Sequence, residues 1–557
     1  MRKTLLILVI LLLMPVTLAK SGHMSLLAVS EKDGIETGTI ADLYLEIVPG
    51  QGRVFIDTFP LTKLDTQLST RFAKSIACNF LDKDCSNYDF FYTIRAKSSI
   101  VGGPSASGAV AVLTIALLDN LELDEKTAMT GTINSGGIIG PVGSVAAKVT
   151  AAQEANFTKV LIPEFGIDDE LKNSTKDLGI GIVNISTLEE AIFEFTGKKY
   201  NKDAVLTIDA DYQRVMGEIA EDLCNRARSF SKSVEGNNSF ISSANVSLEK
   251  AEGLIRLKKY YSAASYCFTS NIKYHYAEQI NITRGSFFEQ INITRDAIKE
   301  FEDTIDRKEI KTLIDLQTFM IVKERIIEAK ENLNESQDLS RRKDQQIYSL
   351  VFAIERLNSA KTWSQFFDTG KKNTIKKENL KISCINKLAE AEERLQYANL
   401  YYPGGLKESE KELRYAYEDA ENGDYDLCLF KASKAKANAD LILTTIRLQK
   451  NQTQELLDKK FELVEDIIAN NELFFPIIGY SYYEYAGVLR EDDEMSALVF
   501  LEYALELSGL DLYFQKEQRS ITNYIDFRLL GVFAVGLGLG LIMGVLIRPR
   551  KKNRIKF

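Results

Sequence analysis

Residues 102–163 read GGPSASGAVAVLTIALLDNLELDEKTAMTGTINSGGIIGPVGSVAAKVTAAQEANFTKVLIP, and this stretch decides the fold of the N-terminal part of the chain. Gly103 and Pro104 precede Ser105, and an uncharged run at 107–118 follows, which predicts a helix that begins near Ser105. The free N–H groups and partial positive charge of a helix N-terminus can hold the oxyanion of an acyl-transfer intermediate. Ser105 is therefore either a nucleophile beside such donors or the N-cap of the helix.

A nucleophilic serine needs a base, and histidine is scarce in this chain. The only two histidines are His23, which follows the apolar N-terminal run, and His275, which lies in a different region of the sequence. A neutral lysine can take the serine proton instead, and burial lowers the pKa of a lysine because it disfavours the ammonium form. Lys148 lies among valines and alanines, with no acidic residue after it until Glu154, so it is the candidate base. The alternative is an ordinary surface lysine on an amphipathic helix.

Four short motifs carry a resemblance to a known family. They are GPSA at 103–106, AMTG at 128–131, GPVG at 140–143 with Lys148 five residues on, and KVLIP at 159–163. In order and in spacing they resemble the proteolytic domain of the Lon family of serine/lysine peptidases. The likeness extends from about Gly34 to about Gly197, so it covers about 165 of the 557 residues.

The resemblance implies a role for each matching residue. Ser105 would be the nucleophile, Lys148 would be the general base 43 positions later, and Thr130 would orient the lysine amine through its hydroxyl. Backbone N–H groups near Ser105 would form the oxyanion hole. The reaction would be hydrolysis of a peptide bond through an acyl-enzyme, with no cofactor and no metal.

The chain departs from the family pattern beside the nucleophile. Ser107 stands in GPSASG where the family usually has a glycine, and Gly102 stands where an acidic residue is often found. Ser107 is an alternative nucleophile, although its distance from Lys148 along the chain is not that of the family. Both changes bear on substrate fit and rate more than on the pairing of Ser105 with Lys148.

Lon enzymes usually carry an ATP-driven unfoldase, and this sequence shows no sign of one. The phosphate-binding motif G-x-x-x-x-G-K-[ST] is absent, and the nearest fragment, at 196–199, lacks the first glycine and the terminal hydroxyl residue. The scattered histidines and cysteines form no zinc pattern. We expect an ATP-independent serine endopeptidase that cleaves unfolded or flexible proteins and peptides, or the chain itself. The alternative is a non-catalytic, membrane-tethered binding or assembly protein built on the Lon-type fold.

Both ends of the chain predict export and a membrane anchor. Residues 1–19 have two basic residues, an apolar run and small residues near Ala19, which is the pattern of a signal peptide; an uncleaved anchor is the alternative. Residues 527–547 include an uncharged run long enough to cross a bilayer, and the basic tail at 548–557 should then be cytoplasmic. We expect a single-pass protein of the cell membrane whose bulk, residues 20–526, is extracytoplasmic.

Residues 20–200 are predicted to form the α+β Lon-type proteolytic domain. Strands at 42–48 and 53–57 should pair directly around the turn at 49–52. A capping box from Ser186 to Glu189 should begin a helix at 187–195. The other expected elements are helices at 66–78 and 107–118 and strands at 88–96, 127–133 and 159–162.

Residues 203–520 are predicted to be all-α, because apolar residues recur there every three or four positions and Pro and Gly are rare. Similar sequences around two cysteine pairs indicate a duplication, with one repeat at 203–365 and another at 366–526. The repeats are expected to be helix hairpins of the tetratricopeptide type, although they show no regular period. The lone Trp363 is expected to be a packing residue. Out of 15 pairings, the spacing favours disulfides Cys224–Cys267, Cys384–Cys428 and Cys78–Cys85, and the alternative is buried free thiols.

The composition also bears on partners. The net charge of −9 and a pI of about 5.3 are unlike the basic face of a nucleic-acid-binding protein, so no nucleic acid is expected. The expected partners are protein substrates and the membrane. A homo-oligomer is a further possibility. Rings are common in the Lon family, although the ATPase that helps to build them is missing here. Gly536, Gly540 and Gly544 are spaced by four, which fits either a contact between helices or a glycine-rich face toward lipid.

Overall fold

In the computed structural model the described residues between 21 and 514 belong to one compact unit. The structure describes residues 19–32, 35–59, 63–96, 104–164, 179–200, 205–234, 236, 238–369, 375, 377–446, 448–449, 452–471, 474–510, 536 and 538. The predicted signal peptide, transmembrane run and basic tail lie outside the described residues except at positions 19, 536 and 538, and Gly102, Gly103, Gly540 and Gly544 also lie outside them. None of the described helices is long and apolar enough to cross a membrane.

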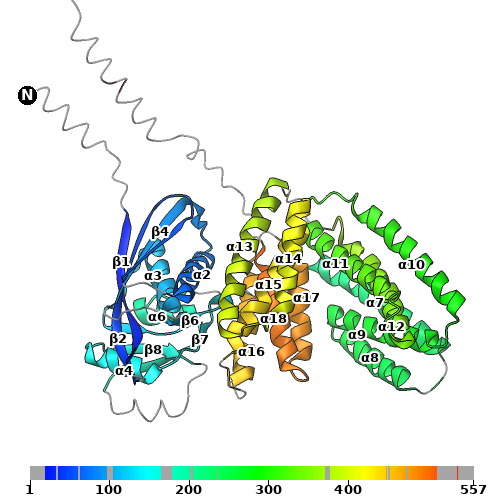
Figure 1. Ribbon diagram of the computed structural model, residues 1–557, viewed down its shortest axis with the longest axis horizontal. Helices are drawn as coiled ribbons and strands as arrows, with labels where there is room; N and C mark the ends of the chain where they lie inside the picture. Colours follow the sequence, from blue (N-terminus) through cyan, green and yellow to red (C-terminus); the bar gives the residue numbers. More distant parts are fainter. Residues whose placement is uncertain are drawn as a thin grey trace, which may run out of the picture. The chain divides into compact units, whose positions relative to one another are not determined.

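The N-terminal part is an α+β domain whose main sheet has the strand order β1-β2-β4-β3. These strands are β1 (Lys20–Lys32), β2 (Ile35–Pro49), β3 (Val54–Phe59) and β4 (Tyr88–Ala96). Alternation along β4 buries Phe90, Tyr92 and Ile94 on one face. Helices α2 (Leu64–Phe80) and α3 (Ser107–Asp119) share an apolar core with that face (Figure 1). The predicted strand at 88–96 and both predicted helices are confirmed.

The predicted direct pairing of strands 42–48 and 53–57 is wrong. Both strands form, as parts of β2 and β3, but β4 lies between them and pairs antiparallel with β2 and parallel with β3. The connection at 49–52 crosses the end of β4, where the buried Asp89 carboxylate accepts hydrogen bonds from the backbone N–H groups of Gln51 and Arg53 at 2.7 and 3.0 Å. The donors of the turn are thus satisfied by β4 rather than by a hairpin partner.

A second, parallel sheet has the strand order β5-β8-β9, and β6 forms a separate short pair with β7. The elements of this part are β5 (Thr127–Met129), β6 (Thr132–Ile133), β7 (Ile139–Gly140), α4 (Val145–Glu154), β8 (Lys159–Pro163) and β9 (Gly181–Ile185). The strand at 159–162 is confirmed, but the one predicted at 127–133 is broken. It breaks because the N–H of Gly131 donates to the carbonyl of Ser105 instead of to a strand. A Cβ at Gly131 would lie 2.5 Å from Ile139, so only glycine fits there.

Helix α6 (Leu188–Thr196) confirms the helix predicted at 187–195 but moves its capping box by one residue. Thr187 is the N-cap: its hydroxyl accepts a hydrogen bond from the N–H of Glu190, and the Glu190 carboxylate accepts one from the N–H of Thr187, both at 3.2 Å. Ser186 does not start the helix because its carbonyl accepts a hydrogen bond from the N–H of Ile139, which holds it beside β7.

The described residues from 210 to 508 are mainly helical, as predicted. The helices are α7 (Ala210–Ser233), α8 (Ser239–Arg256), α9 (Tyr260–Gln279), α10 (Arg284–Ile305), α11 (Leu313–Glu335), α12 (Lys343–Trp363), α13 (Lys377–Tyr401), α14 (Lys407–Asn422), α15 (Tyr425–Thr445), α16 (Thr453–Ala469), α17 (Ile477–Leu489) and α18 (Glu494–Ser508). Trp363 is buried in the apolar core, which confirms it as a packing residue. The division into two repeats stays a prediction.

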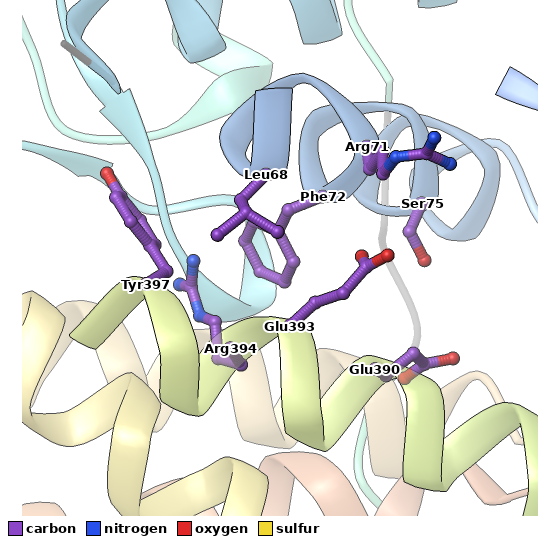
Figure 2. Close-up of a pocket in the computed structure, with 8 residues that line it drawn as sticks. All are labelled: Leu68, Arg71, Phe72, Ser75, Glu390, Glu393, Arg394 and Tyr397. Atoms are coloured by element: carbon purple, nitrogen blue, oxygen red, sulfur yellow. The ribbon is translucent and has the colours of Figure 1, made fainter. Parts of the chain in front are cut away.

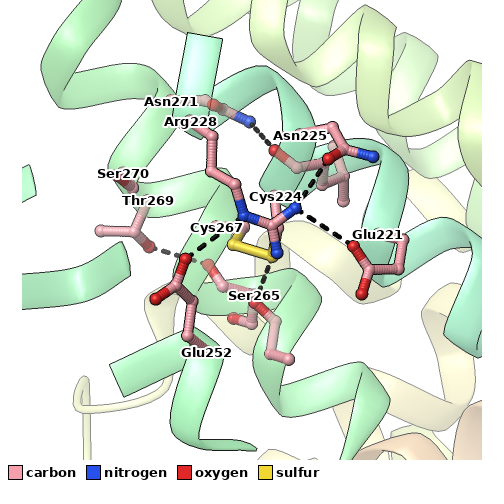
Figure 3. Close-up of a disulfide and its surroundings, with 12 residues drawn as sticks. Glu221, Cys224, Asn225, Arg228, Glu252, Ser265, Cys267, Thr269, Ser270 and Asn271 are labelled. Carbon is pink, nitrogen blue, oxygen red and sulfur yellow. Dashed lines mark hydrogen bonds and ion pairs between the residues drawn. A yellow bond between two sulfur atoms is a disulfide. The ribbon is translucent and has the colours of Figure 1, made fainter. Parts of the chain in front are cut away.

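The three disulfides favoured by the cysteine spacing are all present. Cys78–Cys85 ties the end of α2 to the turn before β4, Cys224–Cys267 joins α7 to α9, and Cys384–Cys428 joins α13 to α15. Figure 3 shows Arg228 of α7 beside the second bond, where its Nε donates to Glu252 of α8 at 3.2 Å. Helix α7 is therefore joined to α9 by a disulfide and to α8 by an ion pair.

Removal of Cys384–Cys428 should cost more stability than removal of Cys78–Cys85. The bonded cysteines are 44 residues apart in the first case and 7 in the second. Loop-closure entropy then predicts losses of about 4 and about 2 kcal/mol. Urea unfolding of the two double alanine variants, followed by circular dichroism, measures both losses. A larger loss from the variant that lacks Cys78–Cys85 would contradict the expectation.

A cluster of buried charges joins α13, α15 and α18. Glu506 of α18 pairs with Lys387 of α13 at 3.0 Å and with Lys436 of α15. Burial alone would raise the pKa of Glu506, but the two ammonium groups outweigh it and lower the pKa to about 2. A lowered pKa stabilises the folded state above the ordinary glutamate pKa of 4.5, and this stabilisation is lost as the pH falls toward 2.

We expect Glu506→Gln to lower the free energy of unfolding by about 3 kcal/mol at neutral pH, because Lys387 and Lys436 each lose one buried carboxylate partner. The variant should also lose less stability than the wild type between about pH 5 and about pH 2, since it has no carboxylate to protonate at this position. Urea unfolding at several pH values measures both effects. Parallel curves for the two proteins would show that ionised Glu506 does not supply this stability.

Candidate active site

Ser105 lies in a short turn, Pro104–Ala106, directly before α3, as predicted. Its carbonyl oxygen accepts hydrogen bonds from the N–H of Gly131 at 2.9 Å and from the Thr130 hydroxyl at 3.4 Å. The N–H of Gly108 in turn donates to the carbonyl of Gly131 at 3.0 Å. The N-terminus of α3 is therefore fixed against the end of β5 by hydrogen bonds in both directions.

Lys148 reaches the same place from α4. Its side chain is buried, with the residue 4% exposed, and its Nζ donates to the Oγ1 of the fully buried Thr130 at 3.2 Å. The Thr130 hydroxyl thus contacts both the lysine amine and the carbonyl of Ser105. The structure brings together three residues that were singled out from the sequence, although they come from three separate elements.

The position of α4 depends on a glycine that the sequence did not indicate. Gly38 of β2 lies against α4, and a Cβ on it would come within 2.0 Å of the carbonyl oxygen of Ala147 and 2.8 Å of the Cβ of Ala151. Ala147 immediately precedes Lys148. Only a residue without a side chain lets the strand and the helix approach so closely, and this approach sets the position of the lysine.

Ser107, the alternative nucleophile, has a structural task. It is buried, its hydroxyl donates to the carbonyl of Pro104 at 2.7 Å, and its oxygen accepts from the N–H of Ile133 at 2.9 Å. The hydroxyl therefore connects the turn that holds Ser105 to β6. In this arrangement both the donor and an acceptor position of the Ser107 hydroxyl are engaged with the backbone.

The two histidines are engaged elsewhere in the fold. His23 of β1 contacts Asp42 of β2 at 2.9 Å, and His275 of α9 contacts Glu355 of α12 at 2.7 Å. Each is held by a carboxylate outside the group formed by Ser105 and its neighbours. Within the described ranges, no group of three or more His, Cys, Asp or Glu side chains is arranged to hold a metal ion.

The helical region touches elements that border this group, and no motif in the sequence indicated it. The loop Asn134–Gly137, between β6 and β7, contacts α16 and α18, and α2 contacts α13. Figure 2 shows the second contact, where Phe72 of α2 faces Arg394 of α13 beside a cavity of about 40 Å³. Periodicity and motif spacing could not show these contacts, because the partners of the loop lie 260 or more positions away.

We expect Gly38→Ala to destabilise the N-terminal domain by about 1–3 kcal/mol, because the new methyl group would overlap the Ala147 carbonyl and push α4 away from β2. The matched control is Gly285→Ala in α10, where a Cβ meets open space. The control should be neutral or slightly stabilising, since alanine favours a helix over glycine. Urea unfolding compares the two variants, and equal effects would contradict the packing role of Gly38.

Archaeal Lon proteases are similar to part of this chain. That of Archaeoglobus fulgidus is 30% identical over 179 residues, which are 32% of this chain and 28% of that protein. The protein from Thermoplasma volcanium is 29% identical over 159 residues, which are 28% of this chain and 24% of that protein. The protein from Methanothermobacter thermautotrophicus is 30% identical over 163 residues, which are 28% of this chain and 25% of that protein. The chain therefore spans about a quarter of the length of these relatives. The stretch that holds Ser105, Thr130 and Lys148 lies within residues 82–194, which match the Lon protease (S16) C-terminal proteolytic domain.

Proposed function

We propose that the chain is a serine endopeptidase in which Ser105 is the nucleophile, Lys148 the general base and Thr130 the residue that orients the base. The observation that carries the proposal is the hydrogen bond from the buried Lys148 Nζ to the Thr130 hydroxyl, beside the turn that holds Ser105. The match of residues 82–194 to a Lon proteolytic domain supports the same roles.

The proposed reaction begins with a neutral lysine. Burial in general disfavours the ammonium form of a lysine, and Lys148 is buried. The Thr130 hydroxyl accepts a hydrogen bond from the Lys148 Nζ and so would fix the direction of the amine. As the Oγ of Ser105 bonds to the scissile carbonyl carbon, its proton passes to the amine. The resulting ammonium then gives this proton to the leaving nitrogen as the scissile C–N bond breaks, which leaves the acyl group on the Oγ of Ser105. Water hydrolyses the acyl-enzyme, with the same lysine as base.

The N-terminus of α3 provides the electrostatic setting for the oxyanion. Its first N–H groups have no partner within the helix and carry a partial positive charge. The N–H groups of Gly108 and Gly131 are already bonded to backbone carbonyls, so the oxyanion would use other N–H groups close to Ser105. A single preorganised donor of this kind accelerates acyl transfer by about 100- to 1000-fold.

We extend the proposal to an enzyme that works without ATP and is anchored in a membrane, with the bulk of the chain extracytoplasmic. Its support lies in the sequence: these 557 residues hold no G-x-x-x-x-G-K-[ST] motif, and the terminal segments have the patterns of a signal peptide and a membrane span. A peptidase that does not unfold its substrate needs an extended segment to be exposed already. Unfolded or flexible proteins and peptides are therefore the proposed substrates.

The full chain should cleave an unfolded protein such as casein without added ATP. Ser105→Ala and Lys148→Ala should each lower kcat/KM by roughly a thousandfold or more, because one removes the nucleophile and the other the base. Thr130→Val should have an intermediate effect, since the amine stays but loses its orientation. Lys126→Ala, which removes an exposed lysine before β5, is the control and should leave cleavage unchanged. Release of fluorescent peptides from labelled casein gives the rates.

Three other outcomes would change the proposal. If cleavage persists in Ser105→Ala and is lost in Ser107→Ala, the nucleophile is Ser107 and not Ser105. No cleavage by the wild type, together with no labelling of Ser105 by a fluorophosphonate, would favour the non-catalytic binding or assembly protein. A single intact mass for the purified chain would count against self-processing.

A further inference from the structure

A buried ion pair of the helical region holds the loop Asn134–Gly137. Ser135 Oγ donates to Glu502 Oε2 of α18 at 2.7 Å, and the other carboxylate oxygen pairs with Lys460 Nζ of α16 at 2.5 Å. Lys460 Nζ also lies 3.5 Å from Ser135 Oγ. The side chains of Lys460 and Glu502 are 0% and 1% exposed. Two full charges are thus kept away from water at the tip of one short loop.

Arg394 of α13 connects the same loop to α2. This arginine is 2% exposed, its Nη2 donates to Asn134 Oδ1 at 3.4 Å, and its Nε donates to Asp440 of α15. Its guanidinium carbon lies 3.7 Å from the ring centre of Phe72 of α2, and Figure 2 shows the two side chains facing each other. One buried side chain therefore contacts both the loop and α2.

Both of these elements border the candidate active site. The loop begins four residues after Thr130 and leads through β7 to α4, which carries Lys148. Helix α2 packs against the turn Pro104–Ala106, which holds Ser105. A displacement of the loop or of α2 would therefore be transmitted to the nucleophile, the base or the residue between them.

The network is costly to bury. Burial raises the pKa of Glu502 even though Lys460 lies beside it. Among the described atoms, Asn134 Nδ2, Arg394 Nη1 and Asp440 Oδ2 are buried and have no hydrogen-bond partner, which is rare in native proteins. Apolar residues of similar volume often stabilise a fold as well as a buried ion pair or better. The charged side chains instead give the contacts with the loop a fixed direction, because Glu502 and Arg394 reach it through hydrogen bonds.

We propose that Lys460, Glu502 and Arg394 are positioning residues for the peptidase. They hold the loop Asn134–Gly137, and through it they keep the Thr130 hydroxyl in line with the lysine base. The helical region is then part of the active enzyme and not a separate module. The inference rests on the proposed function, and the three residues act through the loop without touching the substrate.

The test compares Glu502→Gln with Glu355→Gln in the full chain. Glu355 of α12 is the matched control, because its side chain is also 1% exposed and is paired with Arg226 and His275, apart from the loop. Both variants should lower the melting temperature. Only Glu502→Gln should lower kcat for casein, by roughly tenfold or more with KM unchanged, because misaligned catalytic groups slow the chemical step and not binding. Labelling of Ser105 by a fluorophosphonate should slow by a similar factor.

Ser135→Ala gives a second measurement if Glu502→Gln does not fold. It keeps the ion pair and removes only the hydrogen bond to the loop, so kcat should fall several-fold with little change in melting temperature. A folded Glu502→Gln or Ser135→Ala with wild-type kcat, or an equal loss of kcat in Glu355→Gln, would overturn the positioning role and leave the proposed function intact. A wild-type chain that neither cleaves casein nor is labelled at Ser105 would overturn both.

Discussion

Strand β5 ends at Met129, and the backbone of Gly131 bonds outside the sheet. The arrangement of the site follows from these bonds. In a continuous strand the backbone groups of Gly131 would bond to a neighbouring strand. Here its N–H donates to the carbonyl of Ser105, and its carbonyl accepts from the N–H of Gly108. This exchange draws the N-terminus of α3 to the end of the sheet and leaves the Thr130 hydroxyl facing the amine of Lys148. A backbone constraint thereby places the side chains that the proposed chemistry needs.

The loop Asn134–Gly137 follows this break in the sheet and is flanked only by the short strands β6 and β7. β6 and β7 have two residues each, so this short pair and a few backbone hydrogen bonds are the local support of the loop between them. The helical region supplies the missing contacts through Lys460, Glu502 and Arg394. Because these helices belong to the same chain, their effective concentration at the loop is high and independent of the protein concentration. On the proposal made above, the site is therefore assembled when the chain folds.

The sequence predicted the features that depend on local pattern. The uncharged run after Ser105, the alternation at 88–96 and the three-to-four periodicity beyond 203 each became the expected element. The resemblance to the Lon family singled out Thr130 together with Lys148, and the structure brings the two into hydrogen-bond contact. The cysteine spacing favoured the correct pairs, since the two long-range bonds close stretches of nearly equal length, 43 and 44 residues, and each joins two helices separated by one other helix. For the run after Ser105, the alternation at 88–96 and the periodicity beyond 203, the physical cause lies within one element.

The features that could not be predicted depend on partners far away in the sequence. The residues at 49–52 predicted a hairpin, but the N–H groups of Gln51 and Arg53 donate to Asp89 of β4. Nothing in the sequence indicated that Gly38 would lie against α4. The match to the Lon proteolytic domain ends at residue 194, whereas Lys460 and Glu502 lie far beyond it. Similarity to other proteins can therefore suggest which residues react, but it says nothing of what holds them in place. That support follows only from the contacts between the two regions of this chain.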